Sequence, residues 1–128
     1  MNSPMSIFAL CDQIRKTSFA LHRFLRHGHL EKVDENGRAH RLRKQGLTVT
    51  QQQRLSVKAE DGTVRGDFSA DLMVEDSLII ELKACRTLAD EHLAHLLGHL
   101  RATGVEHGLL VNFGASRLPI RKFALSGV

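Results

Sequence analysis

The chain of 128 residues contains neither tyrosine nor tryptophan, so six phenylalanines are its only large aromatic side chains. Proteins that bind single-stranded nucleic acid commonly stack successive bases on such rings. Binding by base stacking is therefore disfavoured. Glycine-rich phosphate-binding loops are also missing, as is the sharp turn that presents a nucleophilic serine or cysteine. These absences argue against P-loop and serine-hydrolase chemistry.

Cysteines and long apolar runs are equally scarce. Cys11 and Cys85 are the only cysteines, and neither belongs to a CxxC pair, so each is expected to be a free, buried thiol. No apolar run approaches the roughly 18 residues that cross a bilayer. The first residues lack the basic start and apolar stretch of a secretory signal. We therefore expect a cytoplasmic protein that does not span a membrane.

Positive charge is in modest excess, with 18 Lys and Arg against 14 Asp and Glu, a net charge of +4. This balance permits a nucleic-acid partner without requiring one. The length suits one domain with one hydrophobic core, which we expect to occupy residues 1–128.

Two helices are predicted in the first third of the chain. Apolar residues recur at helical spacing from Ile7 to Leu25, which predicts a helix over residues 6–25. A weaker stripe follows from Leu30 to Leu42, and Gly46 could end that second helix in a left-handed conformation.

Strands are predicted next, because the hydrophobic period changes to two. The segments 47–57, 64–74 and 78–83 read as strands, the first two joined at the turn signal Asp61-Gly62. A leucine stripe then predicts a helix before Gly104, and the apolar run 108–114 reads as a buried strand. Strand, helix and strand imply a right-handed parallel crossover and an α/β class. The tail from Ala115 could form a strand or a short helix.

Asp71, Glu81 and Lys83 form the constellation that suggests chemistry. If the hairpin folds about Asp76, Asp71 stands opposite Glu81, and strand alternation places Lys83 on the same face as Glu81. Two such carboxylates repel each other unless one is protonated or a cation lies between them. Mg²⁺ suits two carboxylates plus a substrate phosphate, and the lysine can orient a water molecule. The spacing therefore points to hydrolysis of a phosphodiester, although an ordinary cross-strand salt bridge of Lys83 would give the same pattern.

Four blocks of sequence, in this order, resemble the GxxExxY proteins, which are small members of the PD-(D/E)XK nuclease superfamily. The blocks are Gly28-His29-Leu30-Glu31-Lys32-Val33-Asp34-Glu35-Asn36, Ser69-Ala70-Asp71-Leu72-Met73-Val74-Glu75-Asp76, Ile80-Glu81-Leu82-Lys83-Ala84 and Gly108-Leu109-Leu110-Val111-Asn112-Phe113-Gly114. The resemblance implies a restriction-endonuclease-like core, a central mixed β-sheet flanked by α-helices. It also implies that Asp71 and Glu81 bind Mg²⁺ or Mn²⁺, that Lys83 is the catalytic lysine, and that Glu31 approaches the same site.

The chain departs from the family pattern beside this site. Asp34 stands where the family has tyrosine, and a small or apolar pair is replaced by Gly37 and Arg38. In the late helix, His95 and His99 occupy positions where glutamine and tyrosine are common. Because these changes fall near the expected site, we assign Arg38, His95 and His99 to substrate binding.

Two further groups of residues have more than one interpretation. His95 and His99 lie one helical turn apart, a spacing that can hold a transition metal, although histidines at a core boundary are usually solvated or hydrogen-bonded. Protonated, they could contact a substrate phosphate instead. A basic cluster on the second helix reads as a solvated face or as a contact for a phosphate backbone. Its members are Arg38, Arg41, Arg43 and Lys44.

Three functions remain open on the sequence. The leading one is a Mg²⁺-dependent nuclease. The second is a non-catalytic, homo-oligomeric interaction protein on the same fold, which would use the surface changed at Asp34, Arg38, His95 and His99. The third is a transition-metal protein organised by the helical histidines.

Overall fold

The computed structural model describes residues 5–26 and 30–125 of the chain. Gly28 and His29, which begin the first block of the resemblance, lie outside the described residues, as does the start of the segment considered for a signal. The elements follow in the order α1 (Ile7–Leu25), α2 (Glu31–Lys44), β1 (Val49–Lys58), β2 (Val64–Val74), β3 (Leu78–Lys83), α3 (Asp90–Thr103), β4 (His107–Asn112) and β5 (Ile120–Ala124).

The strands form one five-stranded sheet in the order β1-β2-β3-β4-β5. Strands β3 and β4 are parallel, joined through α3, and the other neighbours are antiparallel. The sheet is therefore mixed, and the α/β class with helices flanking a mixed sheet is confirmed. Of the two alternatives for the tail, the structure adopts the strand, because β5 pairs with β4.

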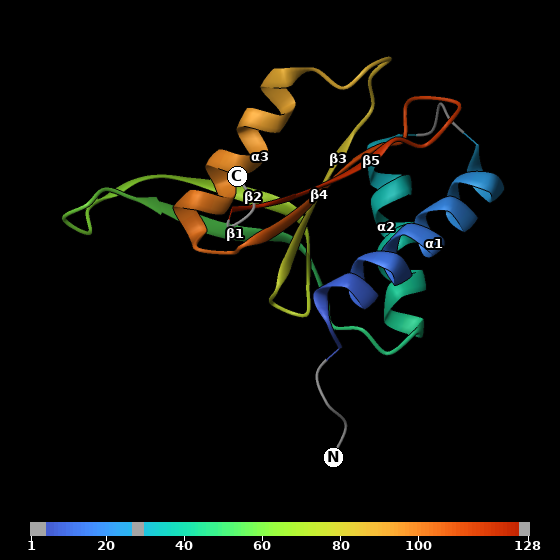
Figure 1. The fold of residues 1–128 in the computed structure, drawn as a ribbon, viewed down its shortest axis with the longest axis horizontal. Coiled ribbons are helices and arrows are strands. Elements are labelled where there is room, and N and C mark those ends of the chain that lie inside the picture. Colours follow the sequence, from blue (N-terminus) through green and yellow to red (C-terminus); the bar gives the residue numbers. More distant parts are fainter. Residues whose placement is uncertain (1–4, 27–29, 126–128) are drawn as a thin grey trace.

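Helices cover both faces of the sheet, α1 and α2 on one side and α3 on the other (Figure 1). Strand β3 contributes side chains to the packing on both faces of the sheet. Leu78, Ile80 and Leu82 pack into the cluster beneath α1 and α2, whereas Ile79 packs with Leu96 beneath α3. Because alternate side chains of a strand point to opposite faces, a strand covered on both sides must be apolar almost throughout.

The helix ends follow from local chemistry. The Ser6 hydroxyl accepts a hydrogen bond from the Ala9 N–H at 3.1 Å, which caps the first turn of α1. Gly104 follows α3 in the left-handed conformation with φ 78°, and Gly46 has φ 90° just after α2. Glycine adopts these angles without a Cβ clash, so both predicted helix ends are confirmed.

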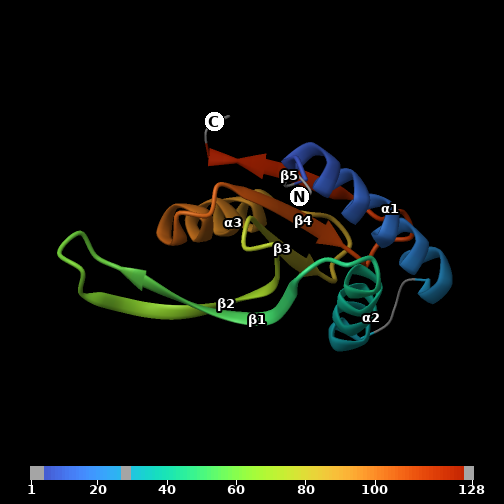
Figure 2. The same ribbon diagram turned by 90° about the horizontal axis from the view of Figure 1, so that it is seen from below.

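The β1–β2 hairpin extends well beyond the rest of the sheet (Figure 2). Strand β2 pairs with β1 from Val64 to Val74, but it pairs with β3 only from Leu72 to Val74. Strand β2 therefore leaves β3 at Asp71, and this divergence places the acidic residue where two strands part.

Candidate active site

Asp71 lies at the point where β2 and β3 separate. The register follows the prediction that paired residue numbers add up to 152, through Val74↔Leu78, Met73↔Ile79 and Leu72↔Ile80. At the next position the Asp71 side chain takes the place of the backbone ladder, since its Oδ2 accepts a hydrogen bond from the Leu82 N–H at 2.7 Å. Strand β3 continues to pair with β4 up to Lys83↔Asn112, so Glu81 and Lys83 stay in the sheet.

The environment of Asp71 disfavours its charged form. Burial raises the pKa of Asp71 above its ordinary value, and the negative charges of Glu81 and Glu35 raise it further. Hydrogen bonds from the Leu82 N–H and the Gln52 amide act in the opposite direction. Asp71 is therefore held in place by donors, yet it still interacts unfavourably with two neighbouring acids.

Glu31, at the start of α2, belongs to the same electrostatic environment. Burial raises the pKa of Glu31, and the charge of Asp71 raises it further, whereas the charge of Lys83 lowers it. Four residues assigned from the sequence, Glu31, Asp71, Glu81 and Lys83, are thus linked by pairwise interactions across α2, β2 and β3.

Glu81 has a partner that the sequence did not predict. The side chain of Glu81 is only 7% exposed, and its Oε1 lies 2.5 Å from Nδ1 of His99 on α3. The His99 ring stacks on Phe68 of β2, with centroids 3.7 Å apart, and the His95 ring stacks with the His99 ring at a centroid distance of 5.7 Å. Of the two histidines assigned to substrate binding, His99 contacts the site acid directly, and the exposed His95 contacts His99.

Sequence reasoning also missed Glu35 and Gln52. Glu35 is 1% exposed and accepts hydrogen bonds from the side-chain amides of Gln51 and Gln52, at 2.7 and 2.6 Å. The Gln52 amide also lies 3.3 Å from Asp71 Oδ1. The one signal in the sequence is spacing, because Glu35 follows Glu31 by one helical turn and so lies on the same side of α2.

Arg38 lies in the protein interior. It is 0% exposed, forms an ion pair with Asp34, and donates from Nε to the Ser18 hydroxyl of α1 at 2.9 Å. The assignment of Arg38 to substrate binding, and of Asp34 and Arg38 to an interaction surface, is therefore inconsistent with the structure. The physical reason is that the two residues face each other one turn apart and neutralise each other between α1 and α2.

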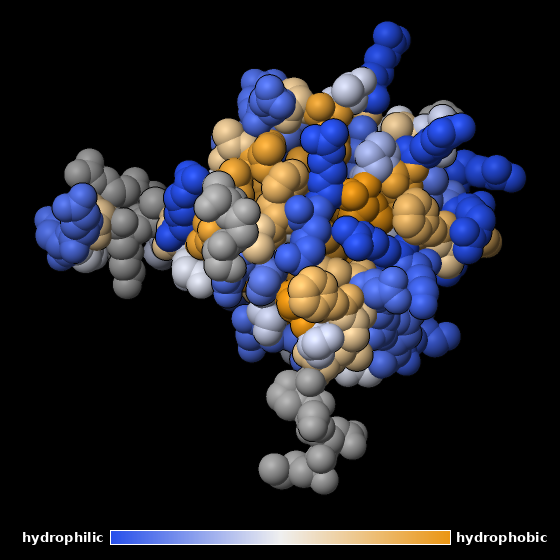
Figure 3. Space-filling model, viewed as in Figure 1, coloured by the Kyte–Doolittle hydropathy of each residue, from blue (hydrophilic) through white to orange (hydrophobic). Residues whose placement is uncertain are grey.

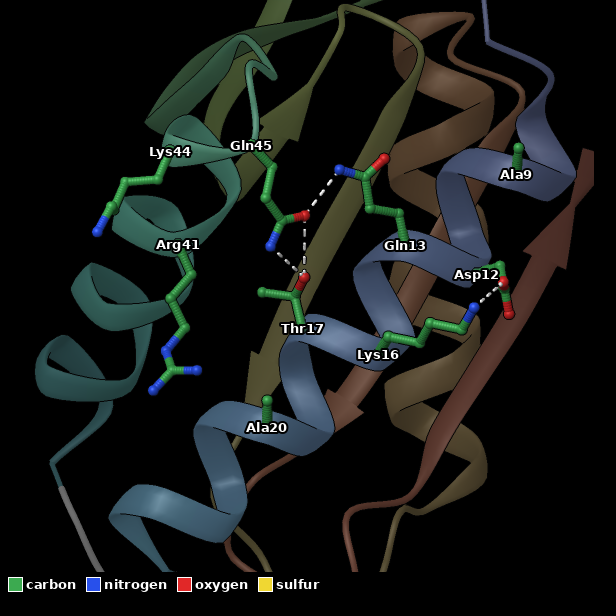
Figure 4. A pocket seen from close by; sticks show the side chains of 9 residues that line it. All are labelled: Ala9, Asp12, Gln13, Lys16, Thr17, Ala20, Arg41, Lys44 and Gln45. Carbon is green, nitrogen blue, oxygen red and sulfur yellow. Dashed lines mark hydrogen bonds and ion pairs between the residues drawn. The ribbon is translucent and has the colours of Figure 1, made fainter.

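The remaining basic residues of α2 do not form one cluster. Arg43 donates to the Val49 carbonyl and the Gln51 side chain. Arg41 and Lys44 line a separate groove of about 580 Å³ between α1 and α2 (Figure 4). Lys16 of α1 lines the same groove and pairs with Asp12 at 3.1 Å. None of the acidic site residues lines this groove, so it is distinct from the site.

The donors at the site match a hard divalent cation in kind. Within residues 5–26 and 30–125, no group of three or more His, Cys, Asp and Glu side chains is arranged to hold a metal ion. Mg²⁺ needs fewer protein ligands, since it keeps several waters and is often held by one or two carboxylates plus phosphate. Asp71 and Glu81 supply such oxygens. The pKa of Asp71 is raised mainly by burial and further by the charges of Glu81 and Glu35, and a cation would relieve that repulsion.

Comparison with known families decides the wider assignment. The sequence profile of the PD-(D/E)XK nuclease superfamily matches residues 9–123, which is most of the chain. The protein belongs to the PD-(D/E)XK nuclease superfamily. Comparison with curated proteins and with solved structures gave no match.

Membership of the PD-(D/E)XK superfamily accounts for the fold and supports a nuclease-like function. Proteins of this superfamily generally use divalent metals, which agrees with the oxygen donors at Asp71 and Glu81. No described helix is long and apolar enough to cross a membrane.

Proposed function

We propose that this protein hydrolyses phosphodiester bonds of nucleic acid with Mg²⁺ or Mn²⁺ as cofactor. The observation that carries the proposal is that several acidic side chains meet at the point where β2 and β3 separate. Asp71 accepts the Leu82 N–H there, and it interacts with Glu81, Glu35 and Glu31. Glu35 and Glu81 of this cluster are buried, and Lys83 and Lys32 lie close enough to interact with Glu31. Such a group of acids suits a cation and a phosphate better than it suits a purely structural role.

The residues take distinct roles in this proposal. Asp71 and Glu81 would hold the ion. When bound, the ion supplies polarisation of a phosphoryl oxygen and a lowered pKa for a coordinated water. Lys83 orients the attacking water and stabilises negative charge as it develops on the phosphate, and Glu31 supports the lysine ammonium electrostatically. In this proposal His99 lies beside the substrate, and His95 contacts the substrate from the exposed side of α3.

The decisive experiment measures cleavage of labelled DNA and RNA, single-stranded, double-stranded and branched, by the purified protein with Mg²⁺ or Mn²⁺. Lys83→Ala should reduce the rate about 100-fold or more, because removing one group that stabilises developing charge costs about that much. Lys16→Ala is the matched control, since the Lys16 side chain is 79% exposed and lies outside the site. Absence of cleavage by the wild-type protein, or an active Lys83→Ala variant that is folded, would overturn the proposal.

Two finer assignments belong with this proposal. The four sequence blocks support a place among the GxxExxY proteins. The length of the chain supports one domain over residues 1–128.

The second candidate is a non-catalytic protein that associates with copies of itself. It is favoured by exposed apolar side chains on α1, where Phe8 and Phe24 are 77% and 75% exposed. Figure 3 shows apolar side chains among charged ones over one face of the molecule. Size-exclusion chromatography with light scattering tests this candidate: a closed oligomer that Phe8→Ser or Phe24→Ser dissociates, together with no metal uptake, would favour it.

A further inference from the structure

Gln52 has an unusual backbone for a residue within a strand. Its φ is 50°, whereas the flanking residues pair regularly with β2 through Gln51↔Leu72 and Gln53↔Ala70. Residues other than glycine rarely adopt positive φ, because Cβ approaches the backbone. Such strain persists where the surrounding structure fixes it, and it concentrates at functional sites. The distortion at Gln52 lies across from Asp71, the residue at which β2 leaves β3.

The Gln52 side chain joins two acids from different elements. Its Nε2 donates to Glu35 Oε1 at 2.6 Å and to Asp71 Oδ1 at 3.3 Å. Glu35 is itself fixed, since it is buried and bound by the Gln51 amide at 2.7 Å and by Lys32 at 3.2 Å. Gln52 therefore links Asp71 to a rigid anchor on α2.

Asp71 is consequently held from both neighbouring strands. Gln52 of β1 binds Oδ1, and the Leu82 N–H of β3 binds Oδ2. A carboxylate with a donor on each oxygen has its plane fixed, and its remaining lone pairs point in fixed directions. Metal ligands are commonly oriented in this way by neighbouring hydrogen-bond donors.

We propose that Gln52 is a positioning residue that orients Asp71 for metal binding by tying its carboxylate to Glu35. The inference rests on the proposed function, in which Asp71 is a metal ligand. This role accounts for the strained backbone of Gln52, because in a regular strand the Gln52 side chain would point in another direction.

The test measures Mn²⁺ affinity by titration followed with electron paramagnetic resonance, so it needs no substrate. Gln52→Met keeps the length of the side chain and removes both hydrogen bonds. We expect its Mn²⁺ affinity to fall about 10- to 100-fold, the usual effect of removing a group that orients a ligand. Gln53→Met is the matched control, because no hydrogen bond joins Gln53 to Glu35 or Asp71 among the described residues, and it should bind as the wild type does.

Gln52→Gly separates positioning from a local structural role. Glycine tolerates φ near 50°, so this variant relieves the backbone strain while it deletes the link. A structural role would leave its Mn²⁺ affinity unchanged, whereas positioning predicts a loss similar to that of Gln52→Met. Thermal unfolding in metal-free buffer checks that both variants are folded.

Asp71→Asn distinguishes this inference from the proposed function. Suppose that the wild type binds Mn²⁺ and that Asp71→Asn does not. If either folded Gln52 variant then binds Mn²⁺ within about 2-fold of the wild type, the proposed role of Gln52 is wrong and that of Asp71 stands. If the wild type fails to bind Mn²⁺, or Asp71→Asn binds equally well, the metal assignment is wrong and the inference falls with it.

Discussion

Glu81 of β3 and His99 of α3 meet side chain to side chain, with Oε1 and Nδ1 2.5 Å apart. The carboxylate is only 7% exposed, so solvent cannot replace this partner easily. Phe68 stacks on the His99 ring and holds it in place. The late helix therefore contributes directly to the acidic site rather than only covering the sheet.

His99→Ala should lower stability and increase the response to metal. Without His99, the Glu81 carboxylate is buried and unpaired, which costs about 1–3 kcal/mol. A divalent ion can replace the lost partner, so Mn²⁺ should raise the melting temperature of His99→Ala more than that of the wild type. Thermal unfolding with and without Mn²⁺ measures both effects.

His95→Ala is the control for this prediction, because His95 is exposed and contacts His99 only by ring stacking. It should leave the Mn²⁺ response near that of the wild type. An equal Mn²⁺ shift in His99→Ala and wild type would contradict the prediction that the ion replaces His99 as the partner of Glu81.

The buried pair of Asp34 and Arg38 should be essential to the packing of α1 against α2. Arg38→Met leaves the Asp34 carboxylate, whose side chain is 4% exposed, without its cation, and it also removes the donor to Ser18. Breaking a buried pair in this way costs about 3–5 kcal/mol. Urea unfolding measures the loss, and Arg23→Met, at an exposed position, should change stability by less than about 0.5 kcal/mol.

The double variant Asp34→Leu with Arg38→Met tests the cause. Because it removes both charges, it should be more stable than Arg38→Met alone. A double variant that loses as much as the sum of the two single changes would mean that the pair does not act as a unit.

Local patterns predicted most of the fold. The hydrophobic period gave the two early helices and strands β2 and β3, and the hairpin register brought Asp71 towards Glu81. These features depend on neighbours in sequence, for which spacing is a reliable guide. The same reasoning could not show that the ladder ends at Leu72, because a side chain that replaces a backbone partner leaves no trace in the pattern.

The missed residues depend on how distant elements pack. Glu35 meets Gln52 only because α2 packs against β1, and His99 meets Glu81 only because α3 packs on β3. No rule of sequence spacing predicts either of these two contacts. Arg38 is different, since the Asp34-to-Arg38 spacing of one helical turn does indicate an ion pair. Its burial could not be inferred, because a charged residue on a polar helix normally faces solvent.

Gly114 should be intolerant of any side chain. A Cβ at this position would lie 2.6 Å from Cys85 N and 2.7 Å from Ala84 C, both backbone atoms just after Lys83. Gly114→Ala must therefore move this segment, and we expect a loss of about 1–3 kcal/mol in urea unfolding. Gly98→Ala is the control. It lies within α3, and apart from the backbone of its own helix and its chain neighbours no atom lies within 4 Å of an added Cβ, so Gly98→Ala should gain about 0.5–1 kcal/mol. Equal effects of the two substitutions would contradict the close approach at Gly114.

Asp71→Asn should stabilise the metal-free protein at neutral pH. The pKa of Asp71 is raised by burial first and by the charges of Glu81 and Glu35 in addition. A carboxyl group whose pKa is higher in the folded than in the unfolded state opposes folding when it is ionised. Asparagine carries no charge, and its side-chain oxygen can still accept the Leu82 N–H. Its amide nitrogen cannot accept from Gln52, so the exposed 3.3 Å hydrogen bond is lost.

The gain should depend on pH in a defined direction. It is complete above the folded-state pKa of Asp71, shrinks as pH falls through that value, and vanishes below the ordinary value of 3.8, where wild-type Asp71 is protonated in both states. Thermal unfolding of both proteins between pH 3 and pH 8 measures the difference. Asp12→Asn is the control: Asp12 pairs with Lys16 on the surface, so losing its charge should stabilise nothing. If Asp71→Asn lowers stability at neutral pH and the loss shrinks in acid, the Asp71 carboxylate is stabilised in the fold, and the electrostatic case for a cation at this site fails.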